Sequence, residues 1–161
     1  MNTVICPGTF DPPTNGHLNI IERAMQIFER VIVLVAGNAA KQPLLTTDER
    51  VALLCALYRD RRGIEIDRTD GLIVTYAQRR QVRTLLRGIR NMSDYEFEFQ
   101  MALANKAMYP GCETLFLMTE GRYSHLSSGI IKEVIRHGGQ ASEMVHPLVE
   151  AALRKKLRQE G

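Results

Sequence analysis

The sequence predicts an α/β fold in which five parallel strands form one doubly wound sheet with helices on both faces. Short runs rich in β-branched residues alternate along the chain with longer stretches of helical periodicity, the order expected of consecutive βαβ units. No internal repeat, low-complexity tract or long linker interrupts that order, so we expect a single Rossmann-like domain over residues 1–161. Because crossovers between parallel strands are right-handed, an open doubly wound sheet is the simplest topology.

Five segments have the character of buried strands. Residues 31–36, Val-Ile-Val-Leu-Val-Ala, form a continuous apolar run of the kind that a strand buried on both faces requires. The other expected strands are residues 3–6, 63–67, 84–87 and 114–118.

The segments between these strands have helical periodicity. Apolar residues recur at helical spacing over residues 18–28 and again over residues 51–58. Thr46 is followed three residues later by Glu49, which fits a capping box and places the start of the second helix there. Further helices are expected at residues 72–80, 94–108, 127–137 and 147–158, the last with proline in its first turn.

Composition and charge exclude several classes of protein. Apolar residues make up 45% of the chain and charged residues 24%, and no stretch approaches the ~20 apolar residues of a membrane span. The net charge of +3 suits anionic ligands but is small for a nucleic-acid-binding protein. The N-terminus does not resemble a signal peptide, and Cys6, Cys55 and Cys112 lie far apart in sequence. We therefore expect a cytoplasmic protein with reduced thiols that binds neither membrane nor nucleic acid.

The loop after the first strand has the composition of a phosphate-binding turn. It reads Pro-Gly-Thr-Phe-Asp-Pro-Pro-Thr-Asn-Gly-His over residues 7–17 and leads into the first helix. Gly8 and Gly16 allow the backbone to approach a bulky anion, and the helix start offers free N–H groups. His17 can donate a ring hydrogen bond to a phosphoryl oxygen. Taken alone, the loop fits equally well with turn-forming glycines and an ordinary histidine in the first helical turn.

The ends of other strands add cations and hydroxyls to the same edge of the sheet, where doubly wound proteins bind their ligands. Lys41 follows the second expected strand, and Arg87 and Arg90 flank a glycine at the end of the fourth. After the fifth strand, residues 121–129 supply hydroxyls and glycines where another helix should begin. Together these groups predict a polyphosphate site.

These motifs resemble those of the phosphopantetheine adenylyltransferases, a family within the nucleotidyltransferases that share a Thr- or His-x-Gly-His turn. Thr-Asn-Gly-His at residues 14–17 resembles that turn, and Pro-Gly-Thr-Phe-Asp-Pro at residues 7–12 resembles the segment before it. Further motifs of the family occur in the right order at residues 86–90, 94–98 and 123–128. The resemblance therefore covers nearly the whole chain.

The resemblance implies a set of substrate contacts. The residues that would contact ATP are Thr9, Phe10, His17, Gly88, Ile89, Arg90, Glu98, Tyr123, Ser124, His125, Leu126, Ser127, Ser128 and Gly129. Those that would hold 4'-phosphopantetheine are Thr9, Lys41, Ile73 and Arg87. Gly129 departs from the family, which usually has a third serine there, so a backbone N–H would replace that hydroxyl. Without the family, Glu98 would be interpreted as a solvated helix residue and Ile73 as a core residue.

The implied reaction moves the adenylyl group of ATP onto 4'-phosphopantetheine, giving dephospho-coenzyme A and pyrophosphate, the penultimate step of coenzyme A biosynthesis. The acceptor phosphate would attack the α-phosphorus in line, without a covalent enzyme intermediate, so catalysis would depend on positioning and charge stabilisation. In that scheme His17 donates to the α-phosphoryl oxygens, Lys41 bridges the two reacting phosphates and Thr9 orients the nucleophile. Arg87 would help to hold the acceptor, and Arg90 would hold the phosphates of ATP.

The resemblance also implies partners, and other functions remain open. Mg²⁺ would arrive with ATP rather than on protein ligands, and the family implies a homohexamer with feedback inhibition by coenzyme A. The nearest alternative is an enzyme of the same fold with another acceptor. An oxidoreductase is disfavoured because no G-x-G-x-x-G turn follows the first strand, and a nucleotide- or RNA-binding module because aromatic residues are few.

Overall fold

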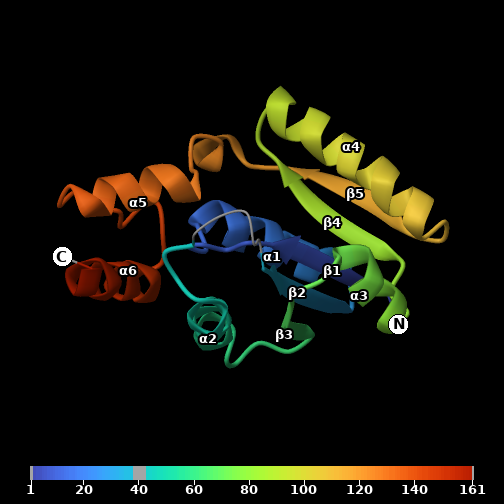
Figure 1. Ribbon diagram of the computed structural model, residues 1–161, viewed down its shortest axis with the longest axis horizontal. Helices are drawn as coiled ribbons and strands as arrows, with labels where there is room; N and C mark the ends of the chain where they lie inside the picture. The colour runs from blue at the N-terminus through green and yellow to red at the C-terminus, as the bar shows by residue number, and fades with distance from the viewer. Residues whose placement is uncertain (1, 38–42, 161) are drawn as a thin grey trace.

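The computed structural model describes residues 2–37 and 43–160, with side chains over 2–37 and 43–159. Its strands are β1 (Thr3–Gly8), β2 (Arg30–Ala36), β3 (Ile64–Thr69), β4 (Thr84–Ile89) and β5 (Glu113–Met118). All neighbouring strands pair in parallel, in the order β3-β2-β1-β4-β5 (Figure 1). The predicted fold class, a doubly wound Rossmann-like sheet, is confirmed.

The expected helices are also present, with small shifts at their ends. They are α1 (Asn15–Ile27), α2 (Thr47–Leu57), α3 (Ile73–Arg79), α4 (Met92–Met108), α5 (Ser128–Arg136) and α6 (Pro147–Glu160). The predicted capping box of α2 is formed, because Thr46 accepts from the Glu49 N–H at 3.2 Å and donates its own N–H to the Glu49 carboxylate at 2.7 Å. A short 3₁₀ helix, η1 (Gly121–Tyr123), was not predicted.

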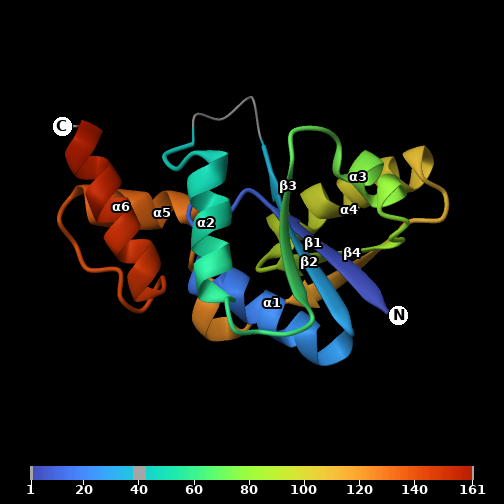
Figure 2. The ribbon, with the colours of Figure 1, turned by 90° about the horizontal axis from the view of Figure 1, so that it is seen from below.

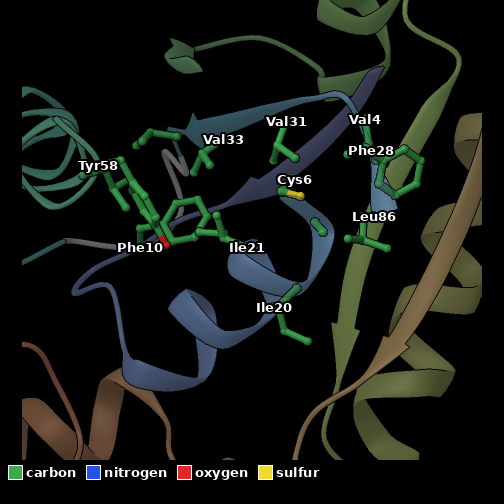
Figure 3. Packing of buried hydrophobic residues seen from close by; sticks show 13 residues of the cluster. Val4, Cys6, Phe10, Ile20, Ile21, Phe28, Val31, Val33, Tyr58 and Leu86 are labelled. Carbon is green, nitrogen blue, oxygen red and sulfur yellow. The ribbon is translucent and has the colours of Figure 1, made fainter. Parts of the chain in front are cut away.

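Side chains of the sheet alternate between two apolar clusters, as strand periodicity requires. One cluster joins Val4, Cys6, Val31, Val33 and Val35 to apolar residues of α1 and α2 (Figure 3). The other joins Ile5, Ile32 and Leu34 to buried residues of α3. Helices therefore cover both faces of the sheet, as predicted.

The C-terminal helices form a third cluster beside the sheet. Apolar residues of α5 and α6 pack against Leu44 and Leu45, which precede α2. Helix α2 contacts the sheet on one side and α6 on the other (Figure 2). This packing brings the start of α5 to the carboxyl edge of the sheet, where the predicted phosphate-binding loops lie. No helix among residues 2–37 and 43–160 is long and apolar enough to cross a membrane.

Strands β1 and β4 each extend two residues beyond the predicted end. Pro7 and Gly8 have the composition of a turn, yet both remain paired with β2. Proline can occupy this place because β1 pairs with β4 only at Ile5, so its missing N–H interrupts no ladder on that side. Similarly, Gly88 pairs with β5. The glycine and the arginine before it thus belong to the strand rather than to the loop after it.

Candidate active site

A cleft of about 690 Å³ lies at the carboxyl ends of β1 and β4. Its size is within the range of small-molecule and cofactor sites. Among its lining residues are Thr9, Phe10, His17, Arg87, Gly88, Arg90, Glu98, Tyr123, Leu126, Ser127, Ser128 and Gly129. The structure therefore gathers most of the predicted site residues from four separate segments around one space.

The start of α1 fixes the orientation of His17. Thr14 is the N-cap residue, and its hydroxyl oxygen accepts from the His17 N–H at 3.2 Å. In return the Thr14 N–H donates to Nδ1 of His17 at 3.0 Å, so the histidine takes the place that glutamate usually has in a capping box. Since Nδ1 accepts, a neutral imidazole carries its proton on Nε2. The ring is thus held as a donor through Nε2.

The electrostatics of the cleft keep that imidazole neutral. Burial, together with the nearby positive charges of Arg87 and Arg90, lowers the pKa of His17 to about 4. The Phe10 ring packs edge-on against the imidazole, with the ring centroids 5.2 Å apart. A β-carbon at Gly8 would lie 2.8 Å from the same phenyl ring, so glycine is required for this packing.

Both arginines of β4 and its following loop are held by carboxylates of α4. Nε of Arg87 lies 2.8 Å from Glu98, and Arg87 also donates to the carbonyl of Pro7. Arg90 binds Asp94 through Nε at 2.8 Å and through Nη2 at 3.0 Å. The Arg90 guanidinium lowers the pKa of the Asp94 carboxyl, so this carboxyl stays charged. The Glu98 side chain is only 12% exposed and paired, so interpreting it as a solvated helix residue is wrong.

The start of α5 forms the opposite wall. Ser127 caps the helix by accepting from the Ile130 N–H at 3.2 Å, and the Ser128 hydroxyl donates to the carbonyl of Pro12 at 3.0 Å. A β-carbon at Gly16 would lie 3.5 Å from Cβ of Tyr123, which shows how closely the start of α1 approaches η1. The N-terminal ends of α1 and α5 therefore both reach the cleft, and the positive end of each helix dipole faces it.

A buried aspartate joins the first loop to two other parts of the wall. Asp11 is 5% exposed and accepts from the N–H groups of Leu44 and Leu45 at 3.0 and 2.8 Å. It also accepts from Nζ of Lys132 at 3.0 Å, which ties the loop to α5. Asp11 thus fixes the position of the segment that enters α2.

Comparison with known proteins places the chain in a family. Residues 5–134 match the model of the cytidylyltransferase-like family. The phosphopantetheine adenylyltransferases of Desulforudis audaxviator and Carboxydothermus hydrogenoformans are each 46% identical to it over 161 residues, which is 100% of this chain and 99% of theirs. The corresponding protein of Alkaliphilus metalliredigens is 46% identical over 156 residues, 97% of this chain and 99% of its own.

The chain belongs to the phosphopantetheine adenylyltransferase family, within the cytidylyltransferase-like proteins. It is therefore a nucleotidyltransferase. A solved structure from Vibrio parahaemolyticus, provisionally named a nicotinate-nucleotide adenylyltransferase, superposes with a TM-score of 0.64 at 18% identity, covering 95% of this chain and 99% of that one. At that identity the likeness supports the shared fold alone.

Lys41, which the resemblance implied as a substrate contact, lies outside the described residues. Four of the described residues that the resemblance implied for this nucleotidyltransferase do not line the cleft. Ile73 begins α3 and packs partly buried against the cluster on that face, and Ile89 is 3% exposed at the end of β4. Ser124 and His125 are exposed in the turn between η1 and α5, where the Ser124 hydroxyl donates to the carbonyl of Gly121.

Four further charged residues line the cleft that we did not predict from the sequence as site residues. They are Asp11, Arg50, Asp94 and Lys132. Asp11 and Asp94 belong to motifs of the family, which was a usable signal, but Arg50 and Lys132 are ordinary cations of helical segments in the sequence. Over the described parts of the chain, no three histidine, cysteine or acidic side chains gather as metal ligands would.

Proposed function

We propose that the chain transfers the adenylyl group of ATP to 4'-phosphopantetheine, giving dephospho-coenzyme A and pyrophosphate. The observation that carries this proposal is a neutral His17 whose Nε2–H is free to donate, placed among two arginines and two helix starts in a cleft of nucleotide size. Such a set of donors suits a polyphosphate. The choice of acceptor is supported by the full-length relatives named phosphopantetheine adenylyltransferase.

The proposed chemistry is a direct in-line displacement. A phosphate oxygen of the acceptor bonds to the α-phosphorus of ATP as the bond from that phosphorus to the oxygen of the β-phosphate breaks, and pyrophosphate leaves with the electron pair. His17 donates through Nε2 to the α-phosphoryl oxygens, where negative charge grows. Thr9 orients the nucleophile, Arg90 holds the phosphates of ATP, and Lys41 and Arg87 bind the acceptor. No step requires a covalent intermediate on the protein.

Mg²⁺ enters this scheme as part of the substrate, bound to the phosphates of ATP. The carboxylates that line the cleft are Asp11, Asp94 and Glu98, and each accepts a hydrogen bond from a lysine or arginine side chain. Mg²⁺ keeps several of its waters and commonly binds through substrate phosphates. The ion would therefore neutralise charge on the phosphates while the arginines orient them.

Release of pyrophosphate tests the proposal. The protein is incubated with Mg²⁺ and ATP, and separately with Mg²⁺ and CTP, in the presence of 4'-phosphopantetheine, nicotinate mononucleotide or glycerol phosphate. We expect release only with ATP and phosphopantetheine, together with dephospho-coenzyme A as product. Release with a different acceptor would keep the chemistry and replace the substrate, whereas no release with any combination would refute the enzymatic proposal.

We also propose that the chain forms a homo-oligomer, a homohexamer by the family resemblance, through α4. This helix buries none of its residues, and its apolar side chains include Phe97 and Leu103, which are 62% and 56% exposed. Leu115 and Met118 of the adjacent edge strand β5 are exposed as well. Exposed apolar surface of this extent commonly marks an interface. Light scattering should show a hexamer for the unmodified protein and a smaller species for a Phe97→Lys variant. A monomeric unmodified protein would contradict the proposal.

Coenzyme A should inhibit at the same site, because it contains the pantetheine and adenosine parts of the proposed product. Inhibition that is relieved by additional phosphopantetheine would support this proposal. Inhibition that does not change with the concentration of either substrate would contradict it.

We further propose that residues 1–161 act as one nucleotidyltransferase domain in the cytoplasm, where ATP is available. The free thiols of Cys6, Cys55 and Cys112 suit that reducing compartment.

A further inference from the structure

Arg50 is a buried charge without a carboxylate partner in the described part of the chain. It is the fourth residue of α2, and it is only 2% exposed. Arginine is almost never fully buried unless it is paired, and the first turns of a helix are an unfavourable place for a cation. Yet none of the ion pairs among the described residues includes it. Its retention at this position calls for a role that compensates the cost of burial.

The guanidinium binds backbone carbonyls at one edge of the cleft. Nη1 donates to the carbonyl of Thr9 at 2.6 Å and, more distantly, to that of Ala36 at 3.5 Å. Nε donates to the carbonyl of Leu45 at 3.1 Å, and Nη2 to the hydroxyl of Thr47 at 2.9 Å. Ala36 ends β2 and Leu45 precedes α2. One side chain therefore ties the first loop to both flanks of the connection between β2 and α2.

Arg50 also sets the charge balance of the cleft wall. The other three cations that line the cleft in the described residues are paired: Arg87 with Glu98, Arg90 with Asp94, and Lys132 with Asp11. Among the described residues, the positive charge of Arg50 is opposed only by carbonyl and hydroxyl dipoles. Because the surroundings are poorly hydrated, this charge acts on the cleft with little screening.

We propose that Arg50 is a positioning residue of the adenylyl transfer, holding Thr9 and the flanks of the Lys41 segment in register and supplying the unpaired positive charge that attracts phosphates. This inference rests on the proposed function. A lysine in its place would keep the charge, but it could not reach the same carbonyls with a planar fork. The two parts of the role are therefore separable by substitution.

Three variants separate those parts. Arg50→Lys keeps the charge and loses the fork, Arg50→Met loses both, and Thr47→Val removes one acceptor while leaving the arginine in place. Arg154→Lys is the control for loss of an arginine side chain outside the cleft. Arg154 belongs to α6, donates to the carbonyl of Gly139 at 2.7 Å, pairs with Glu150 and does not line the cleft. For each variant we would measure the unfolding midpoint, kcat, the KM of both substrates, and the Kd of pyrophosphate by calorimetry.

We expect Arg50→Lys to lower kcat about 10²-fold, the loss typical of a misplaced catalytic group, with pyrophosphate affinity largely kept. Arg50→Met should also weaken pyrophosphate binding. Thr47→Val should lower kcat less, Thr47→Ser should restore it, and Arg154→Lys should leave kcat unchanged. Wild-type kcat in folded Arg50→Lys, or a loss that follows only the unfolded fraction, would refute the positioning role, and unchanged pyrophosphate binding in Arg50→Met would refute the electrostatic role.

The measurements on Arg50 can fail while the proposed function holds, and the reverse is also true. Pyrophosphate binding needs no acceptor, so it reports on the charge of Arg50 whatever the second substrate is. If the wild-type protein uses another acceptor, the proposed function is wrong, and the same kcat comparison with that acceptor decides the role of Arg50.

Discussion

Replacement of His17 by alanine separates the chemical contribution of this residue from its structural one. Nε2–H is the group that we expect to donate to the α-phosphoryl oxygens, and loss of one preorganised donor of this kind typically costs about 10²- to 10³-fold in kcat. The same side chain accepts the Thr14 N–H at 3.0 Å. Since Thr14 is only 3% exposed, its orphaned N–H should cost about 1–3 kcal/mol of folding stability.

The matched control lies in the second capping box of the chain. Glu49 accepts the Thr46 N–H at the start of α2 just as His17 accepts the Thr14 N–H at the start of α1. Glu49→Ala therefore removes the corresponding capping bond, together with the ion pair between Glu49 and Lys156, without removing a donor from the cleft. We expect both variants to unfold at lower temperature, by about 2–4 °C for each kcal/mol lost. Only His17→Ala should also lose turnover at temperatures where it is fully folded.

The assay is pyrophosphate release at saturating ATP and phosphopantetheine, well below the unfolding midpoint of either variant. Substrate KM values should change much less than kcat, because the proposed bond strengthens as charge develops in the transition state. Turnover of folded His17→Ala within a few-fold of wild type would refute the assignment. An equal loss in Glu49→Ala would show that helix capping, rather than the imidazole donor, explains the effect.

Three further outcomes follow from the cleft. By NMR, His17 should titrate near pH 4, and Arg87→Met should raise that pKa because a repelling charge is lost. The imidazole takes up its proton at a higher pH in the unfolded chain than in the folded one. The free energy of unfolding should therefore fall as the pH drops from about 6.5 towards 4. Gly129→Ser should fold normally and lower the KM for ATP, because a β-carbon there meets nothing within 4 Å. Asp94→Asn should release Arg90 and raise the KM for ATP, checked by steady-state kinetics with the unfolding midpoint as control.

The fold was predictable because its signals are local. The composition of residues 31–36 alone predicts a buried strand, and the capping box at Thr46 predicts a helix start from four residues of sequence. Strand ends were predicted less well, since Pro7 and Gly88 are turn-forming residue types that here stay paired with neighbouring strands. Whether such residues continue a strand depends on partners that are distant in sequence.

The composition of the cleft wall was predictable in part, and its internal contacts were not. Strand ends and glycine-rich turns indicated where phosphates could bind, and the family resemblance supplied roles for particular residues. The partner of Asp11, however, is Lys132, 121 residues away. The burial of Arg50 likewise depends on three segments that meet only in the folded chain. Local sequence patterns contain no information on contacts between residues that are distant in sequence.

These contacts also explain how the cleft can be both rigid and attractive to anions. A carboxylate that binds an arginine through two nitrogens fixes the plane of the guanidinium, yet it cancels most of the charge that would draw a phosphate from solution. The pairs of Arg87 and Arg90 thus favour orientation over attraction. Attraction then depends on groups without a counter-charge, which among the described residues are Arg50 and the starts of α1 and α5. Division of the two tasks lets the binding groups keep their geometry before substrate arrives, which is the condition for transition-state stabilisation without reorganisation.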